Sequence, residues 1–359
     1  MDFLIRDALK TAASSSEQDM RIGSANIKVF GVGGGGSNMT SWLFRKGIQG
    51  AEIYALNTDK QHLDISEADY KILLGKEITR GLGCGGFPQK GAEAAKESVH
   101  EVREIIKGAD MVFVCGGMGG GTGTGAAPVV AQISKETGAI VIGCVTMPLD
   151  IEKARIDKAE YGLQQLRQTC DTVIVIDNNR LVQIAGNLPL KEAFAVANEL
   201  VATMIKGIVE IIAVPSLVNL DYADVRAIMK DSGVSVIGIG ESDTSKRVEE
   251  AVKRALSNPL LDVNYTGATG ALIHVTGGDD LTLDEVSRVG DLVSSSLDPD
   301  AQVIWGARIS EDMNGKLRVM TIITGVKSPY VLGSVDYQKR GQEVKNRMSG
   351  MLGIEVVRA

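Results

Sequence analysis

Short apolar runs alternate with amphipathic segments along most of this chain. Runs such as Ile27–Phe30, Ala51–Leu56 and Met111–Val114 have the length of buried strands, and segments with apolar residues at helical spacing follow several of them. This alternation predicts repeated strand–helix–strand units, and therefore an α/β fold with a mostly parallel sheet. Aromatic residues make up only 4% of the chain, so its core must be built mainly from aliphatic side chains.

The pattern divides the chain into five segments. Residues 1–25 resemble an N-terminal arm, and residues 26–188 predict a nucleotide-binding α/β domain. A long apolar helix is predicted at Leu190–Ala213, so residues 189–233 form a central helix followed by a loop and a short helix. Residues 234–326 mix strands with two helices and predict a smaller α+β domain, and residues 327–359 read as a flexible tail.

Charge and composition narrow the possible functions. The 359 residues carry a formal net charge of -7, which argues against nonspecific binding to nucleic acid. No apolar stretch is long enough to span a membrane and the N-terminus lacks a secretion signal, so we expect a cytoplasmic protein without direct membrane insertion. The four cysteines and three histidines lack metal-ligand spacing, so we expect reduced thiols and no metal held by side chains.

Two glycine-rich segments each follow a predicted strand and precede a predicted helix. Residues 31–38 read GVGGGGSN and residues 119–125 read GGGTGTG. Glycine allows close approach of the backbone to a ligand, and a helix N-terminus offers free amides and a positive dipole end to phosphate. Because parallel strands end at one edge of a sheet, the two segments predict two walls of one phosphate site. The chain contains no GxxxxGK[ST] motif, so a P-loop is not expected.

A pair of carboxylates follows far downstream, in the segment NLDYADV at residues 219–225. Asp221 and Asp224 are three residues apart and would share one face of a helix. They could position a water molecule or a hydrated Mg²⁺, or Asp221 could simply cap the helix. The residues alone slightly favour the cap.

Taken together, these motifs resemble the FtsZ family, the prokaryotic tubulin homologues of cell division. GVGGGGSN, ALNTD, TRGLGCGG, GGGTGTG and NLDYADV stand in that family's order, and IGIGES, ATGALIHVTGG and VIWGARI resemble its second domain. The resemblance covers about residues 26–326 and is stronger to the archaeal branch. It implies a tubulin/FtsZ-like fold, in which a Rossmann-like GTP-binding domain is joined by the long central helix to the smaller α+β domain.

The resemblance also implies an activity and partners. The protein would be a GTPase that polymerises head to tail into protofilaments of the division ring at mid-cell. In the family, the loop equivalent to residues 219–224 enters the nucleotide pocket of the next subunit, which makes Asn219, Asp221 and Asp224 catalytic rather than only capping. A flexible tail in the family ends in a peptide that binds a membrane-anchoring adaptor protein, and residues 352–357 resemble it; a disordered end is the other interpretation.

The binding residues implied by the resemblance come from five places in the chain. GTP or GDP would be the cofactor, with Mg²⁺ held mainly by phosphate and water. Phosphate and nucleoside contacts are expected from Gly34, Gly35, Gly36, Ser37, Asn38, Gly120, Gly121, Thr122, Gly123, Thr124 and Gly125. Asn57 and Asp59 would lie near the phosphate-sensing edge, while Phe194 would stack on guanine and Asn198 would hydrogen-bond its edge.

The segment expected at the ribose departs from the family pattern. The family commonly has Glu-Gly-x-x-Arg here, whereas this chain has Glu152 and Arg155 in a segment that is one residue shorter and lacks the glycine. The two residues are expected to keep their roles with altered geometry.

Two other functions remain open from the residues. An NAD(P)-dependent oxidoreductase could use Gly31–Gly36 with Glu52 as the ribose-binding acid, but the second glycine segment would then have no role. A filament or scaffold protein of the same fold without hydrolysis is the other alternative, and the intact carboxylates of residues 219–224 argue against it.

Overall fold

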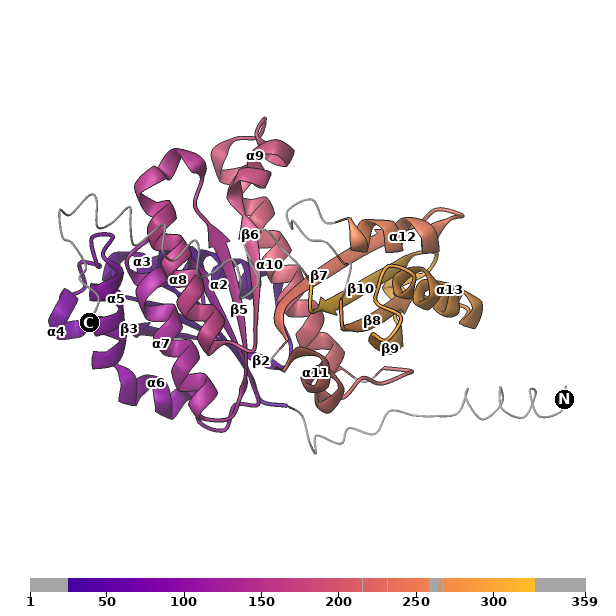
Figure 1. The fold of residues 1–359 in the computed structure, drawn as a ribbon, viewed down its shortest axis with the longest axis horizontal. Helices are drawn as coiled ribbons and strands as arrows, with labels where there is room; N and C mark the ends of the chain where they lie inside the picture. The colour runs from indigo at the N-terminus through magenta and orange to yellow at the C-terminus, as the bar shows by residue number, and fades with distance from the viewer. Residues whose placement is uncertain (1–24, 215, 231, 258–264, 266–267, 327–359) are drawn as a thin grey trace, which may run out of the picture.

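The computed structural model describes residues 25–214, 216–230, 232–257, 265 and 268–326 (Figure 1). The predicted arm at residues 1–25, apart from its last residue, and the predicted tail at residues 327–359 with its terminal peptide lie outside the described residues. The described part forms two α/β regions that lie side by side (Figure 1).

Within these residues, ten strands form one sheet in the order β3-β2-β1-β4-β5-β6-β7-β10-β8-β9. The strands β1 to β6 are parallel to one another, as predicted. Their order, 3-2-1-4-5-6, reverses between β1 and β4, which is the point in such a sheet where ligands bind. The bounds are β1 (Ile27–Val32), β2 (Ala51–Asn57), β3 (Tyr70–Leu73), β4 (Met111–Gly117), β5 (Ile140–Met147) and β6 (Thr172–Asp177).

The second region continues the sheet with mixed strand directions. β7 joins β6 in parallel at its first two residues, and β10 is then antiparallel to both β7 and β8. β9 pairs in parallel with β8 and forms the edge of the sheet. The bounds are β7 (Gly233–Ser242), β8 (Gly270–Gly277), β9 (Gln302–Ile309) and β10 (Leu317–Thr324).

Helices cover both faces of the parallel strands. Side chains from α5, α6, α7 and α8 form one buried cluster with the sheet, and those from α2 and α10 form another on the other face. The bounds are α2 (Gly33–Lys46), α3 (Lys60–Ile65), α4 (Lys76–Thr79), α5 (Pro88–Glu97), α6 (Val99–Ile106), α7 (Thr122–Glu136), η1 (Asp150–Arg155), α8 (Ile156–Thr169), α9 (Asn178–Ala185), α10 (Leu190–Ala213), α11 (Tyr222–Met229), α12 (Arg247–Leu256), α13 (Leu283–Ser294) and η2 (Glu311–Met313).

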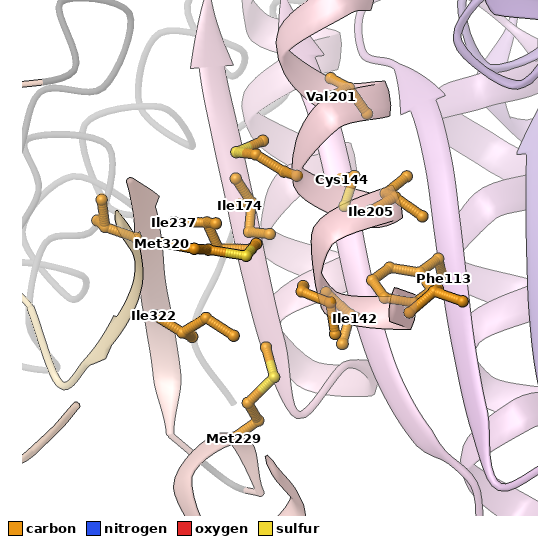
Figure 2. Close-up of a cluster of buried hydrophobic side chains, with 14 of the residues drawn as sticks. Phe113, Ile142, Cys144, Ile174, Val201, Ile205, Met229, Ile237, Met320 and Ile322 are labelled. Atoms are coloured by element: carbon orange, nitrogen blue, oxygen red, sulfur yellow. The ribbon is translucent and has the colours of Figure 1, made fainter. Parts of the chain in front are cut away.

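The long helix α10 has the predicted bounds and joins the two regions through one core. Val201 and Ile205 of α10 lie in the same buried cluster as Phe113 of β4 and as Ile237 and Met320 of the second region (Figure 2). Because this cluster is continuous, neither region can move far without disturbing the packing of α10.

Two predicted helices have different ends in the structure. The helix predicted from Pro128 begins at Thr122, inside the second glycine segment, because close backbone packing there outweighs the poor helix propensity of glycine. The helix predicted across residues 91–107 is divided into α5 and α6 at Ser98, whose hydroxyl accepts a hydrogen bond from the Gly75 amide (3.2 Å). In both cases a distant part of the chain decides the helix end.

The four cysteine thiols lie in the core of the protein. All four cysteines are buried and none is in a disulfide. Burial raises the pKa of Cys170 to about 12, so this thiol stays protonated at neutral pH.

The second region is stabilised by a guanidinium held between α12 and α13. The Arg247 side chain is only 12% exposed and donates two hydrogen bonds to Glu285 (2.7 and 2.9 Å), one to the Asp280 carboxylate (2.6 Å) and one to the Asp280 carbonyl (3.3 Å). We expect Arg247→Lys to lower the free energy of unfolding by about 2 kcal/mol, because an ammonium cannot reproduce this forked arrangement. Arg288→Lys is the matched control, since Arg288 pairs with Glu249 between the same helices at the surface and should change stability by less than about 0.5 kcal/mol. Urea unfolding measures both.

The same contact predicts a pH dependence. Hydrogen bonds from Arg247 lower the pKa of Glu285 and of Asp280. A lowered carboxylate pKa contributes stability above the unfolded-state value, and this contribution is lost as the pH falls through the folded-state value. Between about pH 7 and about pH 3, wild type should therefore lose more stability than Arg247→Lys. Equal losses in the two proteins would contradict this assignment.

Candidate functional site

The two glycine segments lie side by side at one edge of the sheet, as expected. They follow β1 and β4, which are adjacent and in register, with Val32 opposite Gly116. The backbone of the first segment contacts the second segment and the end of β4, because a Cβ at Gly33 would lie 2.8 Å from the Gly123 nitrogen, and one at Gly35 would lie 3.0 Å from the Gly117 Cα. The sheet therefore brings both segments to the point where its strand order reverses.

Each segment opens a helix whose N-terminus is suited to an anion. The residues before α2 and α7, Val32 and Gly121, make no side-chain capping bond in the described structure, and the first turns hold no acidic residue. The Gly119 amide donates to the Thr124 hydroxyl (2.8 Å), which closes the second loop. Two helix dipoles therefore present their positive ends, each about half an elementary charge, at one place.

The glycines of the two segments have two different environments. Those at positions 121, 123 and 125 allow close packing, since a Cβ there would lie 2.6 Å from the Cys84 Cβ, 2.4 Å from the Gly117 oxygen and 1.9 Å from the Pro88 oxygen, respectively. A Cβ at Gly120 would meet no protein atom within 4 Å, and one at Gly34 would meet only the His62 ring, at 3.8 Å. Gly34 and Gly120 are therefore the positions where a ligand could approach the backbone.

The loop after β2 forms a third wall. The Thr58 and Thr122 hydroxyls are 2.7 Å apart, which ties this loop to the start of α7. Asn57 Oδ1 accepts hydrogen bonds from the Thr58 amide (2.9 Å) and the Asp59 amide (3.2 Å). Asp59 caps α3 by accepting from the His62 amide (3.1 Å). Asn57 and Asp59 thus lie beside the glycine segments and shape this loop.

The shortened segment of Glu152 and Arg155 also reaches the site. It forms the 3-10 helix η1, in which Arg155 donates to Glu152 (2.5 Å) and Glu152 accepts from the Leu149 amide (3.1 Å). A Cβ at Gly119 would lie 2.9 Å from the Arg155 Cβ, so η1 packs directly on the second glycine loop. The missing residue therefore does not remove these side chains from the site.

The start of α10 lies beside the start of α2. The Trp42 indole donates to Glu199, and one turn later Lys46 donates to Glu199 and to the Thr203 hydroxyl (2.6 Å), so the two helices run side by side in the same direction. Five residues earlier on each helix, about 7.5 Å along the axis, are Ser37 and Phe194. Phe194 is 39% exposed, as a stacking ring requires, and Asn198 follows one turn later on the same face.

Asn178, the first residue of α9, was not predicted as a site residue. Its Oδ1 and the Ser37 hydroxyl are buried, and in the described part of the chain neither has a hydrogen-bond partner. Buried polar atoms without a partner are rare, and each needs an explanation such as a bound water, ion or ligand. The available sequence signal was the position of Asn178 directly after a buried strand, at the same sheet edge as the glycine segments.

The carboxylates of Asp221 and Asp224 lie near the amino ends of the parallel strands, opposite the glycine segments. Asp221 and Asp224 form a capping box at the start of α11: the Asp224 amide donates to Asp221 (2.8 Å) and the Asp221 amide donates to Asp224 (3.1 Å). The Tyr222 hydroxyl donates to the Asp110 carbonyl (2.7 Å), immediately before β4 begins. The glycine segment is at the far end of β4, about 20 Å away. Figure 1 shows α9 and α11 at opposite ends of the parallel strands.

Comparison with known proteins identifies the family. Residues 26–186 match the Tubulin/FtsZ family, GTPase domain, and residues 233–327 match the FtsZ family, C-terminal domain. The chain is 54% identical to "Cell division protein FtsZ 2" of Methanocaldococcus jannaschii, over 94% of this chain and 90% of that protein. The chain belongs to the FtsZ family. It is also 52% identical to "Cell division protein FtsZ 1" of Thermococcus kodakarensis, over 90% and 87% of the two chains.

Solved FtsZ structures agree with this assignment. A single-substitution mutant of M. jannaschii FtsZ superimposes with a TM-score of 0.79 at 49% identity, covering 90% of this chain and 95% of that one. An empty FtsZ dimer of M. jannaschii gives a TM-score of 0.78 at 47% identity, covering 92% and 97%. The predicted tubulin/FtsZ-like fold is confirmed, and residues 26–186 form the GTPase domain of a cell-division GTPase family.

The FtsZ assignment gives no support to an oxidoreductase. Glu52, the acid considered for the ribose, is the second residue of β2 and so lies near its amino end, away from the glycine segments. It is paired with Lys28 (2.7 Å) and accepts a hydrogen bond from the Tyr54 hydroxyl (2.7 Å), and both contacts lower its pKa. Spacing alone suggested Glu52, but its position in the strand rules out that role.

The two glycine environments predict that one added methyl group weakens GTP binding at Gly120 and lowers stability at Gly125. Gly120→Ala should unfold at the wild-type temperature, yet bind GTP about 10- to 100-fold more weakly, because its Cβ meets no protein atom and faces the anion site. Gly125→Ala should lose about 3 kcal/mol of stability, since its Cβ would overlap the Pro88 carbonyl. Thermal unfolding and nucleotide titration distinguish the two, and an unchanged GTP affinity in Gly120→Ala would remove Gly120 from the site.

Proposed function

We propose that this FtsZ-family chain is a cytoskeletal GTPase that assembles head to tail, with each active site completed by the next subunit. The observation that carries the proposal is the position of Asp221 and Asp224. They lie about the length of β4 away from the glycine segments of their own chain, so they can meet a nucleotide only on another copy.

In this proposal the pocket side supplies binding. The two helix starts, with Gly34–Asn38 and Gly120–Gly125, hold the phosphates. The loop of Asn57 and Asp59 lies at the γ-phosphate, and Glu152 and Arg155 contact the ribose. The guanine is recognised by Phe194, Asn198 and Asn178. Mg²⁺ would be bound mainly by phosphate and water, since the described residues include no group of three or more His, Cys, Asp or Glu side chains able to hold a metal.

In the same proposal, Asp221 and Asp224 of the neighbouring subunit supply the catalytic groups for GTP hydrolysis. Hydrolysis of GTP requires a residue that orients water against the γ-phosphate, and a carboxylate can serve. The capping box commits one oxygen of Asp221 and one of Asp224 and fixes the orientation of both. A carboxylate has a second oxygen to offer to water, so the capping and catalytic roles are compatible. Asn219 is exposed beside them.

Exposed apolar side chains at both ends support stacking of copies. Leu82, Phe87 and Ile151, beside the glycine segments, are 83%, 63% and 83% exposed. Leu217 and Trp305, beside the carboxylate loop, are 76% and 43% exposed. Apolar surfaces of this kind mark interfaces, and contact between two different faces repeats without closing, which generates a filament.

Location and further partners follow from the same proposal. The chain would act in the cytoplasm at the mid-cell division site, and its tail would bind a membrane-anchoring adaptor protein. In the part of the chain that the structure describes, no helix is long and apolar enough to cross a membrane. Light scattering recorded together with phosphate release distinguishes this GTPase from a scaffold that assembles without hydrolysis.

Substitution of Asp224 separates its two roles. Asp224→Asn keeps an oxygen acceptor for the Asp221 amide and removes the charge, so α11 should remain capped. We expect GTP binding and thermal stability near wild type, with turnover reduced about 100-fold or more. Asp224→Ala should lose the same turnover and additionally about 0.5 kcal/mol of stability, because it removes the acceptor of the Asp221 amide while the capping bond to Asp221 remains.

Dilution tests whether the site is shared between subunits. Below the assembly threshold, turnover per wild-type subunit should fall steeply, because isolated chains lack the carboxylates at their own nucleotide. Turnover that stays constant per subunit on dilution would refute the shared site.

A further inference from the structure

We propose that the edge strand β9 of the second region positions the carboxylate loop, and that Gly306 is the positioning residue. This inference rests on the proposed function, because it concerns carboxylates presented to a neighbouring subunit. It assigns the second region a positioning part in hydrolysis, although none of the pocket residues named above belongs to that region.

The first observation is a backbone clamp between the loop and β9. The Val218 amide donates to the Ala307 carbonyl (3.0 Å), and the Ala307 amide donates to the Val218 carbonyl (3.1 Å). This antiparallel bridge lies on the free edge of β9, opposite its pairing with β8. It fixes the loop backbone three residues before Asp221.

The second observation is a side-chain anchor. Leu220, directly before Asp221, is only 2% exposed and packs against Gly306. A Cβ at Gly306 would lie 2.7 and 2.8 Å from Leu220 Cγ and Cδ1, and 2.9 Å from the Val218 carbonyl oxygen. The backbone of Gly306 is not in the left-handed region, so alanine is conformationally acceptable there and only this contact demands glycine.

The third observation is that the carboxylates lie between anchors from both regions. On the other side of Asp221, the Tyr222 hydroxyl is bonded to the Asp110 carbonyl of the parallel sheet. A displacement of β9 relative to that sheet must therefore move the start of α11. Because of the clamp, the position of Asp221 and Asp224 depends on how the two regions are placed relative to one another.

Gly306→Ala tests the proposal. The added methyl group must displace Leu220, and a shift of about 1 Å at a catalytic group can cost up to about 100-fold in rate. We expect turnover per assembled subunit to fall by about 10- to 100-fold, with GTP affinity unchanged because the pocket of the same chain is untouched; light scattering measures the assembled fraction for this comparison. Gly290→Ala is the matched control in the same region, because its Cβ would meet nothing within 4 Å.

A second substitution tests the contact itself. Leu220→Ala alone removes the anchor and should lower turnover without changing GTP affinity. Combined with Gly306→Ala it should lower turnover little further, because both substitutions act on the same contact. Wild-type turnover in Leu220→Ala, or fully additive losses in the double variant, would refute the anchor. If Gly306→Ala fails to fold, Val218→Pro removes one donor of the clamp without adding volume at Gly306, and the same fall in turnover is expected.

Asp224→Asn, assayed in parallel, distinguishes the two levels of the proposal. If Asp224→Asn loses turnover while Gly306→Ala or Val218→Pro keeps wild-type turnover, the positioning role of β9 is wrong and the shared site stands. If Asp224→Asn itself keeps wild-type turnover, the shared site is wrong and the positioning role falls with it. A loss of GTP affinity in Gly306→Ala matching its loss of turnover would also overturn the inference.

Discussion

The close backbone contact between the two glycine segments is the constraint on which the rest of this structure depends. Strands β1 and β4 end at the reversal of strand order, and their following helices can start there only if side chains do not separate them. Gly33 against Gly123 and Gly35 against Gly117 meet this condition. The contact brings the uncapped starts of α2 and α7 together. Their summed dipoles make this site favourable for phosphate, although the protein as a whole carries a negative net charge.

Two rigid elements, α10 and β4, connect the glycine segments with the opposite end of the parallel strands, where Asp221 and Asp224 lie. The helix α10 begins beside the start of α2 and continues into the core that both regions share, while β4 connects the second glycine segment to the carbonyl that holds Tyr222. Asp221 and Asp224 lie too far from the glycine segments to reach a nucleotide bound there in the same subunit. In the function proposed above, this separation is the reason why hydrolysis requires assembly of subunits.

Much of the fold followed from local patterns, because apolar periodicity and glycine segments depend on neighbours in the chain. Leu190–Ala213 has the predicted bounds, and both glycine segments occur where strand and helix meet. Prediction failed where distant contacts decide the outcome. Ser98 divides a helix because Gly75 bonds to it, and Glu52 suits an oxidoreductase by spacing but lies at the wrong end of its strand. Asn178 escaped notice because no motif marks it, only its burial without a partner.

The sequence by itself determined the α/β class, the two glycine segments and the resemblance to the FtsZ family, since these are written in residue order and spacing. Only the tertiary structure decided which glycines pack against protein and which border open space, because Gly120 and Gly125 are alike in sequence and differ in what surrounds them. It also placed Asp221 and Asp224, which form the capping box of α11, far from the glycine segments of the same chain. The capping box is local, but the distance of both residues from the glycine segments, and the clamp on β9, arise from how strands far apart in the chain pack together.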